Sequence, residues 1–407
     1  MGVKIIVNLV FKLVITAFLT LILSSAVSAN NETWQSETVI NGFLSNTPMV
    51  LDSSNNPHIS YHDFSGSDLK YTSWDGSSWH TETVDNSGDV GLMNSMALDS
   101  DDNPHISYYD STNQDLKYAH WDGSSWQIET VDSLGNVGGL TSLALDLLNN
   151  PHISYYDFSN SILKYTHWDG GLWHTETIAN VGGGSRSSIA LDSNDNPHIG
   201  YYGAGGDLIY AVWDGSSWQT ETVDSSGDVG DYPAVALDSD DNPHISYYDI
   251  ANHDLKYAHW DGSEWQINTI WFVGMFGQSF LALDSHNNPH VSFTGNIGSA
   301  NFALLYASGD GSSWQVEIVD RQFNGGYISL AMDSADNPHI IYNNYHDSLK
   351  YAYKVSNPVI SNDVMGIYTK KTVGMQETGE PISRLGLVFL MLCGGLFLTL
   401  RERKTPQ

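Results

Sequence analysis

A pair of tyrosines followed by an aspartate recurs along this chain and could bind a ligand. Tyrosine offers an aromatic ring and a hydroxyl, while aspartate accepts hydrogen bonds from sugar hydroxyls or binds cations. Two copies end in glycine instead, at Gly203 and Gly295, which either opens a gap for one ligand or has no functional meaning. One copy of the motif carries histidine in place of the second tyrosine. The candidate ligand-binding residues are His62, Asp63, Tyr109, Asp110, Tyr156, Asp157, Tyr248 and Asp249.

Two acidic segments have the spacing of a calcium loop. Oxygen-bearing side chains stand at alternate positions in each, as they do in Ca²⁺-binding loops. The same composition is typical of a tight turn, in which Asp and Asn bond their own backbone and the following Pro fixes φ. We favour turn capping, because most other copies lack the middle acidic residue, and keep Ca²⁺ as the alternative; no other cofactor is expected. The candidate metal ligands are Asp99, Asp101, Asn103, Asp238, Asp240 and Asn242.

Seven histidines follow seven equivalent prolines. A metal site needs ligands that converge on one point, whereas one histidine in each repeat places them far apart. We therefore expect a structural role, in which each imidazole is at least half-buried and hydrogen-bonds a nearby turn. The histidines are His58, His105, His152, His198, His244, His290 and His339.

These motifs belong to one repeat of 46 to 49 residues, which the chain contains seven times. Each copy predicts four strands with period-two alternation, separated by Asn-Pro and Asp-Gly turns. A period in the forties built from short strands is typical of a β-propeller with one blade per repeat. The sequence therefore predicts an all-β fold, a seven-bladed β-propeller with four antiparallel strands per blade. The prolines that mark the repeat are Pro57, Pro104, Pro151, Pro197, Pro243, Pro289 and Pro338.

The last repeat lacks its fourth strand. It stops near residue 353, and the missing Trp-x-x-Glu-Thr-Val segment stands instead at residues 34–39, before the first repeat. An open array would expose unpaired strand edges at both ends. We therefore expect residues 33–40 to complete the seventh blade and close the ring, within a propeller that spans residues 30–355.

A tryptophan hairpin between the third and fourth strands carries a family resemblance. The segment Trp-Asp-Gly-Ser-Ser-Trp at residues 74–79 recurs in the following repeats. It resembles the Asp-box families, whose propellers carry Ser-x-Asp-x-Gly-x-x-Trp on this hairpin, although here Gly directly follows Asp. The resemblance implies a structural hairpin that faces away from an active site; a tryptophan that stacks on a sugar is the alternative.

Sialidases are the best-known Asp-box enzymes, and they clamp a carboxylate with three arginines. The repeats of this chain contain only Arg186 and Arg321. Such a clamp cannot be built from two arginines, so the resemblance does not extend to sialidase activity.

The charge balance excludes one class of partner. The 407 residues include 47 acidic and 16 basic side chains, for a formal net charge of −31. Such a surface repels phosphate backbones, so nucleic acid is not an expected partner. The only cysteine is Cys393, so the repeats contain no disulfide and packing alone must hold the ring together.

The two ends of the chain predict export and attachment. Residues 1–29 have the basic start, apolar run and small final residues of a secretory signal peptide. Residues 356–383 read as a linker, and residues 384–407 combine an apolar stretch with a basic end, typical of a membrane anchor or of a microbial sorting signal. We expect a protein on the outer face of the cell membrane or envelope, anchored at its C-terminus.

The repeat itself favours binding over catalysis. Near-identical blades offer equivalent sites, whereas enzymes break symmetry to assemble one site. We therefore expect a non-enzymatic binding or display module, for a glycan or a surface protein. The alternatives are a glycan-active enzyme with its site at the central mouth, which needs a convergent pair of carboxylates, and a purely structural envelope component.

Overall fold

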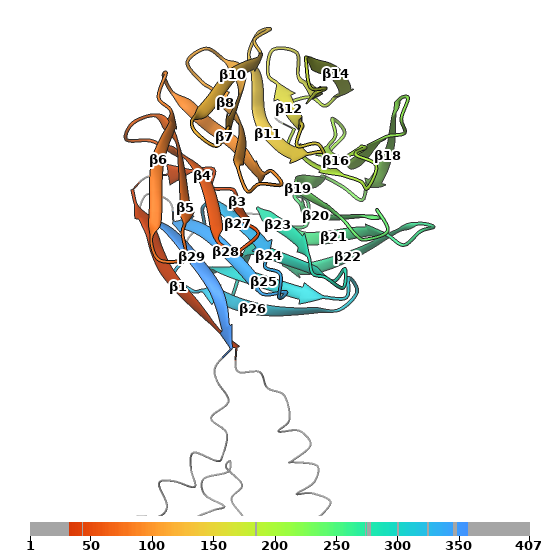
Figure 1. The fold of residues 1–407 in the computed structure, drawn as a ribbon. Helices are drawn as coiled ribbons and strands as arrows, with labels where there is room; N and C mark the ends of the chain where they lie inside the picture. Colours follow the sequence, from red (N-terminus) through yellow and green to blue (C-terminus); the bar gives the residue numbers. More distant parts are fainter. Residues whose placement is uncertain are drawn as a thin grey trace, which may run out of the picture. The chain divides into compact units, whose positions relative to one another are not determined.

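The computed structural model describes residues 32–356, except 43, 184, 273, 275–277, 299–300, 324 and 345–347. The regular structure of this part of the chain consists of strands, which form seven antiparallel sheets around a ring (Figure 1). The prediction of a seven-bladed β-propeller is confirmed. Blades are numbered in chain order, from blade 1 at residues 44–85 to blade 7, which contains residues 328–356 together with 32–41.

The inner half of each blade is formed by its first two strands. Small residues suit the innermost strand, because seven strands crowd around the axis. The innermost strands are β2 (Leu44–Ser45) and β3 (Met49–Leu51), β7 (Val90–Leu98), β11 (Val137–Leu145), β15 (Ser187–Leu191), β19 (Val229–Leu237), β23 (Ser279–Leu283) and β27 (Ile328–Met332). The second strands, buried between neighbouring blades, are β4 (Pro57–Asp63), β8 (Pro104–Asp110), β12 (Pro151–Asp157), β16 (Pro197–Tyr202), β20 (Pro243–Asp249), β24 (Pro289–Asn296) and β28 (Pro338–Asn344).

The outer half of each blade is formed by a hairpin, whose last strand is the more exposed. The third strands are β5 (Asp68–Trp74), β9 (Asp115–Trp121), β13 (Ile162–Trp168), β17 (Leu208–Trp213), β21 (Asp254–Trp260), β25 (Phe302–Gly309) and β29 (Ser348–Ser356). The fourth strands are β6 (Trp79–Asp85), β10 (Trp126–Asp132), β14 (Trp173–Asn180), β18 (Trp218–Asp224), β22 (Trp265–Phe272), β26 (Trp314–Asp320) and, in blade 7, β1 (Glu32–Asn41).

The N-terminal strand closes the ring, as predicted. β1 pairs antiparallel with β29 from Glu32↔Ser356 to Asn41↔Ser348, and Figure 1 shows the two strands side by side, in red and blue. Side chains continue this closure, because Leu44 and Ile59 of blade 1 pack with Ile341 of blade 7. The first described residues therefore lie beside the last ones.

The hydrophobic core is divided among the interfaces between adjacent blades. At one interface, Leu69 and Tyr71 of blade 1 pack with Met96, Ile106 and Tyr108 of blade 2. The described residues form seven such clusters. A blade therefore buries its faces only against its neighbours, as the units of repeat proteins do.

A second circle of contacts joins the turns between the first and second strands. The fourth residue of each turn has a positive φ, which Asn and Asp tolerate. Its side chain accepts a hydrogen bond from a backbone N–H in the turn of the preceding blade. The donor and acceptor residues are Ser53 and Asp102, Ser100 and Asn149, Leu147 and Asp195, Ser193 and Asp241, Ser239 and Asn287, Ser285 and Asp336, and Ser334 and Asn55.

The tryptophan hairpins connect neighbouring blades. The Trp126 indole lies edge-on to Tyr71 of the preceding blade, with ring centroids 5.5 Å apart, and donates to Glu82 Oε1 at 3.1 Å. Asp122 Oδ1 accepts the backbone N–H groups of Ser124 and Ser125 in the turn. These contacts give the hairpin a structural role, while the relationship to the Asp-box families stays a prediction.

Candidate functional site

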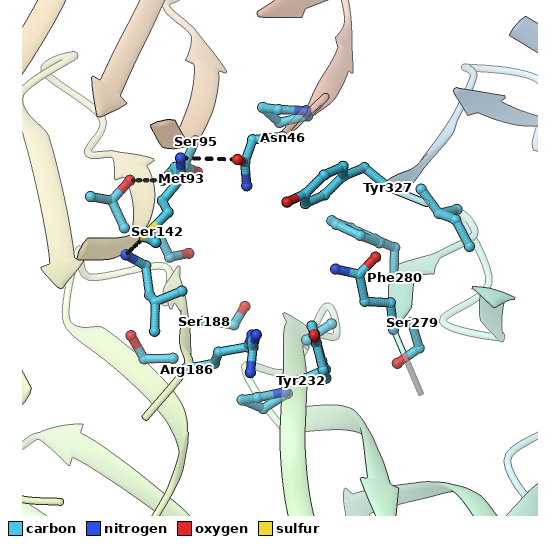
Figure 2. A pocket seen from close by; sticks show the side chains of 18 of the residues that line it. Asn46, Met93, Ser95, Ser142, Arg186, Ser188, Tyr232, Ser279, Phe280 and Tyr327 are labelled. Carbon is cyan, nitrogen blue, oxygen red and sulfur yellow. Dashed lines mark hydrogen bonds between the residues drawn. The ribbon is translucent and has the colours of Figure 1, made fainter. Parts of the chain in front are cut away.

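One end of the central channel opens into a cavity of about 270 Å³ (Figure 2). Its lining comes from all seven blades, from short segments that lie within or just before the innermost strands. Figure 2 shows Asn46, Arg186, Tyr232, Phe280 and Tyr327 around the open centre. The cavity is therefore a single site on the ring axis, to which each blade contributes one short segment.

The repeats differ most clearly at one position of this lining. Six residues before the aspartate that starts the first turn, nearly every blade carries a different residue type. We call these residues the rim residues; they are Asn46, Met93, Leu140, Arg186, Tyr232, Gln278 and Tyr327. They make an asymmetric site at the centre of an otherwise repetitive molecule.

An unusual backbone conformation holds several rim residues. Met93, Leu140 and Tyr232 have φ of 53°, 53° and 51°. These values lie in the left-handed region, which residues other than glycine rarely adopt. The pairing register with the second strand shifts at the same places, as in a β-bulge. Bulges re-aim side chains, and strained residues of this kind cluster at functional sites.

Two neighbouring side chains orient Arg186, the charged residue of the cavity lining. Arg186 Nη1 donates to Asp231 Oδ1 at 3.1 Å, and the guanidinium carbon lies 3.7 Å from the centroid of the Tyr232 ring. The Asp231 carboxylate also accepts the backbone N–H of Tyr232 at 3.0 Å. The Arg186 side chain remains 35% exposed, so it can still meet a ligand.

Hydrogen bonds between blades fix the opposite side of the rim. The backbone N–H of Met93 donates to Asn46 Oδ1 at 3.1 Å, and Asn94 Nδ2 donates to the Asn46 carbonyl at 3.0 Å. Thr141 Oγ1 donates to the Met93 carbonyl at 3.0 Å. These contacts run from blade to blade, so the rim is organised before any ligand arrives.

The Tyr-Tyr-Asp residues lie outside this cavity, each in its own blade. The second tyrosines are largely buried, and their hydroxyls bond loop groups, as Tyr109 does with Asn136 Oδ1 at 2.9 Å. The aspartates are buried too, and Asn side chains of the following loop donate to them. In the variant copy, His62 is buried beside Asp89 at 3.0 Å and Asp63 caps the turn at Ser65. The structure does not bring together His62, Asp63, Tyr109, Asp110, Tyr156, Asp157, Tyr248 and Asp249, whose ligand-binding role stays a prediction.

These aspartates belong to a charge cluster between blades. At the interface of blades 1 and 2, Asp85 Oδ2 accepts hydrogen bonds from Tyr108 Oη at 2.6 Å and from Lys117 Nζ at 2.5 Å. Asp110 lies 4.0 Å from the same ammonium. Burial opposes the ionisation of Asp85, but the bonds from Lys117 and Tyr108 outweigh it and lower its pKa to about 2. We call Asp85, Asp110 and Lys117 the interblade charge cluster.

The cluster is complete at three of the interfaces between blades and is replaced entirely at two others, which explains the two glycine variants. Blade 4 has Ile209 in place of the lysine, and a Cβ on Gly203 would come within 2.8 Å of it. Blade 6 has Leu305, and a Cβ on Gly295 would lie 2.4 Å from its side chain. The fourth strands of the preceding blades have Ala179 and Trp271 at the position of the first aspartate of the cluster.

The candidate calcium segments act as turn caps. Asp99 Oδ1 accepts the backbone N–H groups of Asp101 and Asn103, and Asn103 Nδ2 donates to Asp99 Oδ2. The described residues contain no group of three or more His, Cys, Asp or Glu side chains arranged to hold a metal ion. Calcium binding stays a prediction that only titration tests; in the second segment Asp238, Asp240 and Asn242 make the same contacts.

The seven repeated histidines have the structural role predicted for them. In blade 3, His152 Nδ1 lies 2.6 Å from the Tyr165 hydroxyl, and Nε2 faces the turn aspartate Asp146 at 3.7 Å. Burial, together with the neighbouring His167, lowers the pKa of His152 to about 4. Burial likewise lowers the pKa of His105 to about 4 and lowers those of the other five.

Acid is therefore expected to destabilise the propeller between pH 6.5 and pH 4. An unfolded histidine binds a proton near pH 6.5, whereas the buried ones resist protonation, so each stabilises the fold fully above pH 6.5 and loses this effect as the pH falls. Each such histidine adds up to about 1.4 kcal/mol per pH unit to the slope of the unfolding free energy. Urea titrations across this range measure that slope.

The double variant His105→Gln, His152→Gln is the control for this prediction. Without these two histidines, the unfolding free energy should depend less steeply on pH, by roughly 2.7 kcal/mol per pH unit, which corresponds to two protons. This change is expected whatever the effect of the variant on stability at pH 7. Added salt should leave the slope in place, because screening acts mainly on exposed charges. A pH-independent unfolding free energy between pH 6.5 and pH 4 would contradict the prediction.

Sequence reasoning missed the rim. The signal was present as an aligned position at which nearly every copy has a different residue type, but it requires the seven copies to be compared position by position. The predicted signal peptide, linker and C-terminal anchor lie outside the described residues. Within the described part of the chain, no helix has the length and apolar character needed to cross a membrane.

Comparison with known proteins identifies the fold but no family. No protein-family model matches the chain, and no curated protein matches it in sequence. Among solved structures, a catalytically inactive variant of virginiamycin B lyase from Staphylococcus aureus is similar, with a TM-score of 0.58, 10% identity, and coverage of 80% of this chain and all of the lyase.

Two further similar structures have lower scores. AofleA from Arthrobotrys oligospora has a TM-score of 0.49 and 14% identity over 71% of this chain and 90% of its own. The six-bladed fungal lectin of Aleuria aurantia has a TM-score of 0.47 and 13% identity over 72% of this chain and 100% of its own. At such identities a structural likeness concerns the fold alone.

Proposed function

We propose that this protein is a non-enzymatic binding module whose ligand enters the cavity at the mouth of the central channel. The single observation that carries the proposal is the divergence of the seven rim residues, all of which line one shared cavity. Divergence turns seven equivalent segments into one asymmetric cavity. Concave sites with a few oriented polar groups are where proteins bind small ligands.

An asymmetric cavity suits a single binding site as well as an active site, and the residues that line this one support binding rather than catalysis. Among the described residues that line the cavity there is no carboxylate, histidine, cysteine or lysine, and Arg186 is the one charged side chain. A glycan-active enzyme of the usual kind places two carboxylates across the scissile bond. The propeller fold as such hosts catalysis in the similar lyase, so the lining and not the fold carries this argument.

A glycan terminus is the ligand that fits best. The rings of Tyr232, Phe280 and Tyr327 line the cavity beside the amides of Asn46 and Gln278. Aromatic rings pack against the apolar faces of sugars, while amides and hydroxyls bond their hydroxyl groups. A volume of about 270 Å³ suits one sugar residue at the end of a longer chain better than an extended protein surface.

Replacing Tyr232 by glycine is expected to weaken glycan binding by at least about tenfold, or ~1.4 kcal/mol, without loss of folding. Glycine adopts the φ of 51° at this position without strain, so the backbone of the rim should persist while the ring is lost. A glycan array followed by calorimetry on any hit measures the effect.

Ser161→Gly is the matched control, since Ser161 also has a positive φ, of 56°, but lies away from the cavity. It should bind as the wild type does. An array without any hit, or equal weakening by both variants, would refute the proposed site.

Export and anchoring complete the proposal. The signal-peptide and anchor patterns at residues 1–29 and 384–407 support a location on the outer face of the cell, where glycans are accessible. A relationship to the Asp-box families is also proposed, on the hairpin sequence alone. Mass spectrometry of the protein recovered from washed cell envelopes tests both ends, because cleavage before Asn30 and retention of the C-terminus predict distinct masses.

A further inference from the structure

The hairpin of blade 6 lacks a tryptophan that blades 1 to 5 share. In those blades the third strand ends in a Trp paired directly with the Trp that starts the fourth strand. The ring centroids are 5.5 to 5.9 Å apart. In blade 6, Gly309 pairs with Trp314 instead, so the ring that covers its equivalents is missing.

A cavity of about 450 Å³ lies where that ring is missing. Gly309 and Trp314 line it, together with Asn288 of the turn between the first two strands. In blade 1, Trp74 itself lines the cavity beside the equivalent turn, which measures about 240 Å³. The cavity in blade 6 thus lies where a glycine stands in place of that tryptophan.

Two polar side chains in this cavity have lost their usual partner. In blade 2, Gln127 Nε2 donates to Asp122 Oδ2 at 2.8 Å, and blades 4 and 5 repeat this bond. In blade 6, Asp310 uses Oδ1 to cap the hairpin, but Gln315 makes no bond to its other oxygen. Both side chains line the cavity.

His290 adds a buried polar atom to the same cavity. Its Nε2 faces Asp284 Oδ2 at 3.4 Å, as the repeated histidines of the other blades face their turn aspartates at 3.4 to 3.7 Å.

We propose that the blade 6 cavity, lined by Asn288, His290, Gly309, Asp310, Trp314 and Gln315, binds a neutral pyranose ring. The Trp314 indole, which lines the cavity without a second tryptophan beside it, offers a platform for the apolar face of the sugar, and the Gln315 amide and Asp310 carboxylate offer hydrogen bonds to its hydroxyls. Two carboxylates in the lining and a net charge of −31 disfavour an anionic sugar. This site is separate from the channel mouth and does not depend on it.

The test is a titration of 15N-labelled protein with methyl glycosides of glucose, galactose, mannose and N-acetylglucosamine, followed through the tryptophan indole N–H signals. The Trp314 signal, assigned with Trp314→Phe, should shift with at least one glycoside at a millimolar dissociation constant, as expected for a single sugar. If none of the four shifts it at tens of millimolar, the proposal is overturned.

Matched variants show whether the sugar occupies this cavity. Gln315→Ala should weaken binding about tenfold, whereas Gln266→Ala, which removes the paired glutamine of blade 5, should have no effect. Asp310→Asn, which keeps one oxygen for the hairpin, should weaken binding similarly. Tyr232→Gly should leave the Trp314 shift unchanged. The proposed site at the channel mouth and the proposed site in blade 6 can therefore be refuted independently of each other. Equal behaviour of the Gln315 and Gln266 variants would refute the site.

Discussion

Deletion of residues 30–40 is expected to abolish folding. The deletion removes β1, which supplies the whole fourth strand of blade 7, and exposes the edge of β29 to solvent and to other chains. It also removes Trp34, whose indole donates to Glu317 Oε2 of blade 6 at 3.0 Å. Because each blade buries its faces only against its neighbours, the loss should spread around the ring, and the product should be unfolded or aggregated by circular dichroism and size-exclusion chromatography.

A circular permutant is the control for this deletion. Moving residues 30–41 to follow residue 356 through a short glycine linker restores the strand in a different covalent order. It should recover a cooperative melting transition, because the pairing of β1 with β29 is antiparallel and their ends are adjacent. A deletion variant that melts like the wild type would show that β1 is not needed to close the ring. The hydrogen bonds between the turns of neighbouring blades, such as the one from Ser334 to Asn55, would then be sufficient.

Asp85→Ala is expected to destabilise the protein by about 3–5 kcal/mol. The change removes the closest partner of the buried Lys117 ammonium, which keeps only Asp110 at 4.0 Å and the Ser87 hydroxyl at 3.2 Å, and it removes the acceptor of the fully buried Tyr108 hydroxyl. An uncompensated buried charge costs more than the ion pair itself contributes. The free energy of unfolding in urea at pH 7 measures the effect.

A second set of substitutions, copied from another interface of the same chain, should restore the stability that Asp85→Ala removes. The interface of blades 3 and 4 has Ala179, Gly203 and Ile209 where the charge cluster stands, so Asp85→Ala, Asp110→Gly, Lys117→Ile copies an arrangement that the fold already accepts. The triple variant should regain more than half of the lost stability. A triple variant no more stable than the single one would mean that the cluster is not a replaceable unit.

The interblade charge cluster also shows why sequence reasoning misjudged the surroundings of the Tyr-Tyr-Asp residues. A tyrosine pair and an aspartate at a loop look accessible when one repeat is considered alone. The burial of Asp110 comes from the lysine of its own third strand and from the aspartate of the preceding blade, which lies 25 positions earlier in the chain. The two glycine copies likewise have a packing reason, since they accommodate Ile209 and Leu305.

The amino-acid sequence by itself determined the number of blades, their four strands, the strand that closes the ring and the structural role of the repeated histidines. Such features follow from local alternation, turn residues and a fixed period, all of which can be read along one stretch of chain. Only the tertiary structure decided where a binding cavity forms, because the rim residues are about 46 positions apart and meet only at the axis of the closed ring. Their direction depends on backbone bulges and left-handed conformations, at Met93, Leu140 and Tyr232, that packing between blades imposes and that no local pattern encodes.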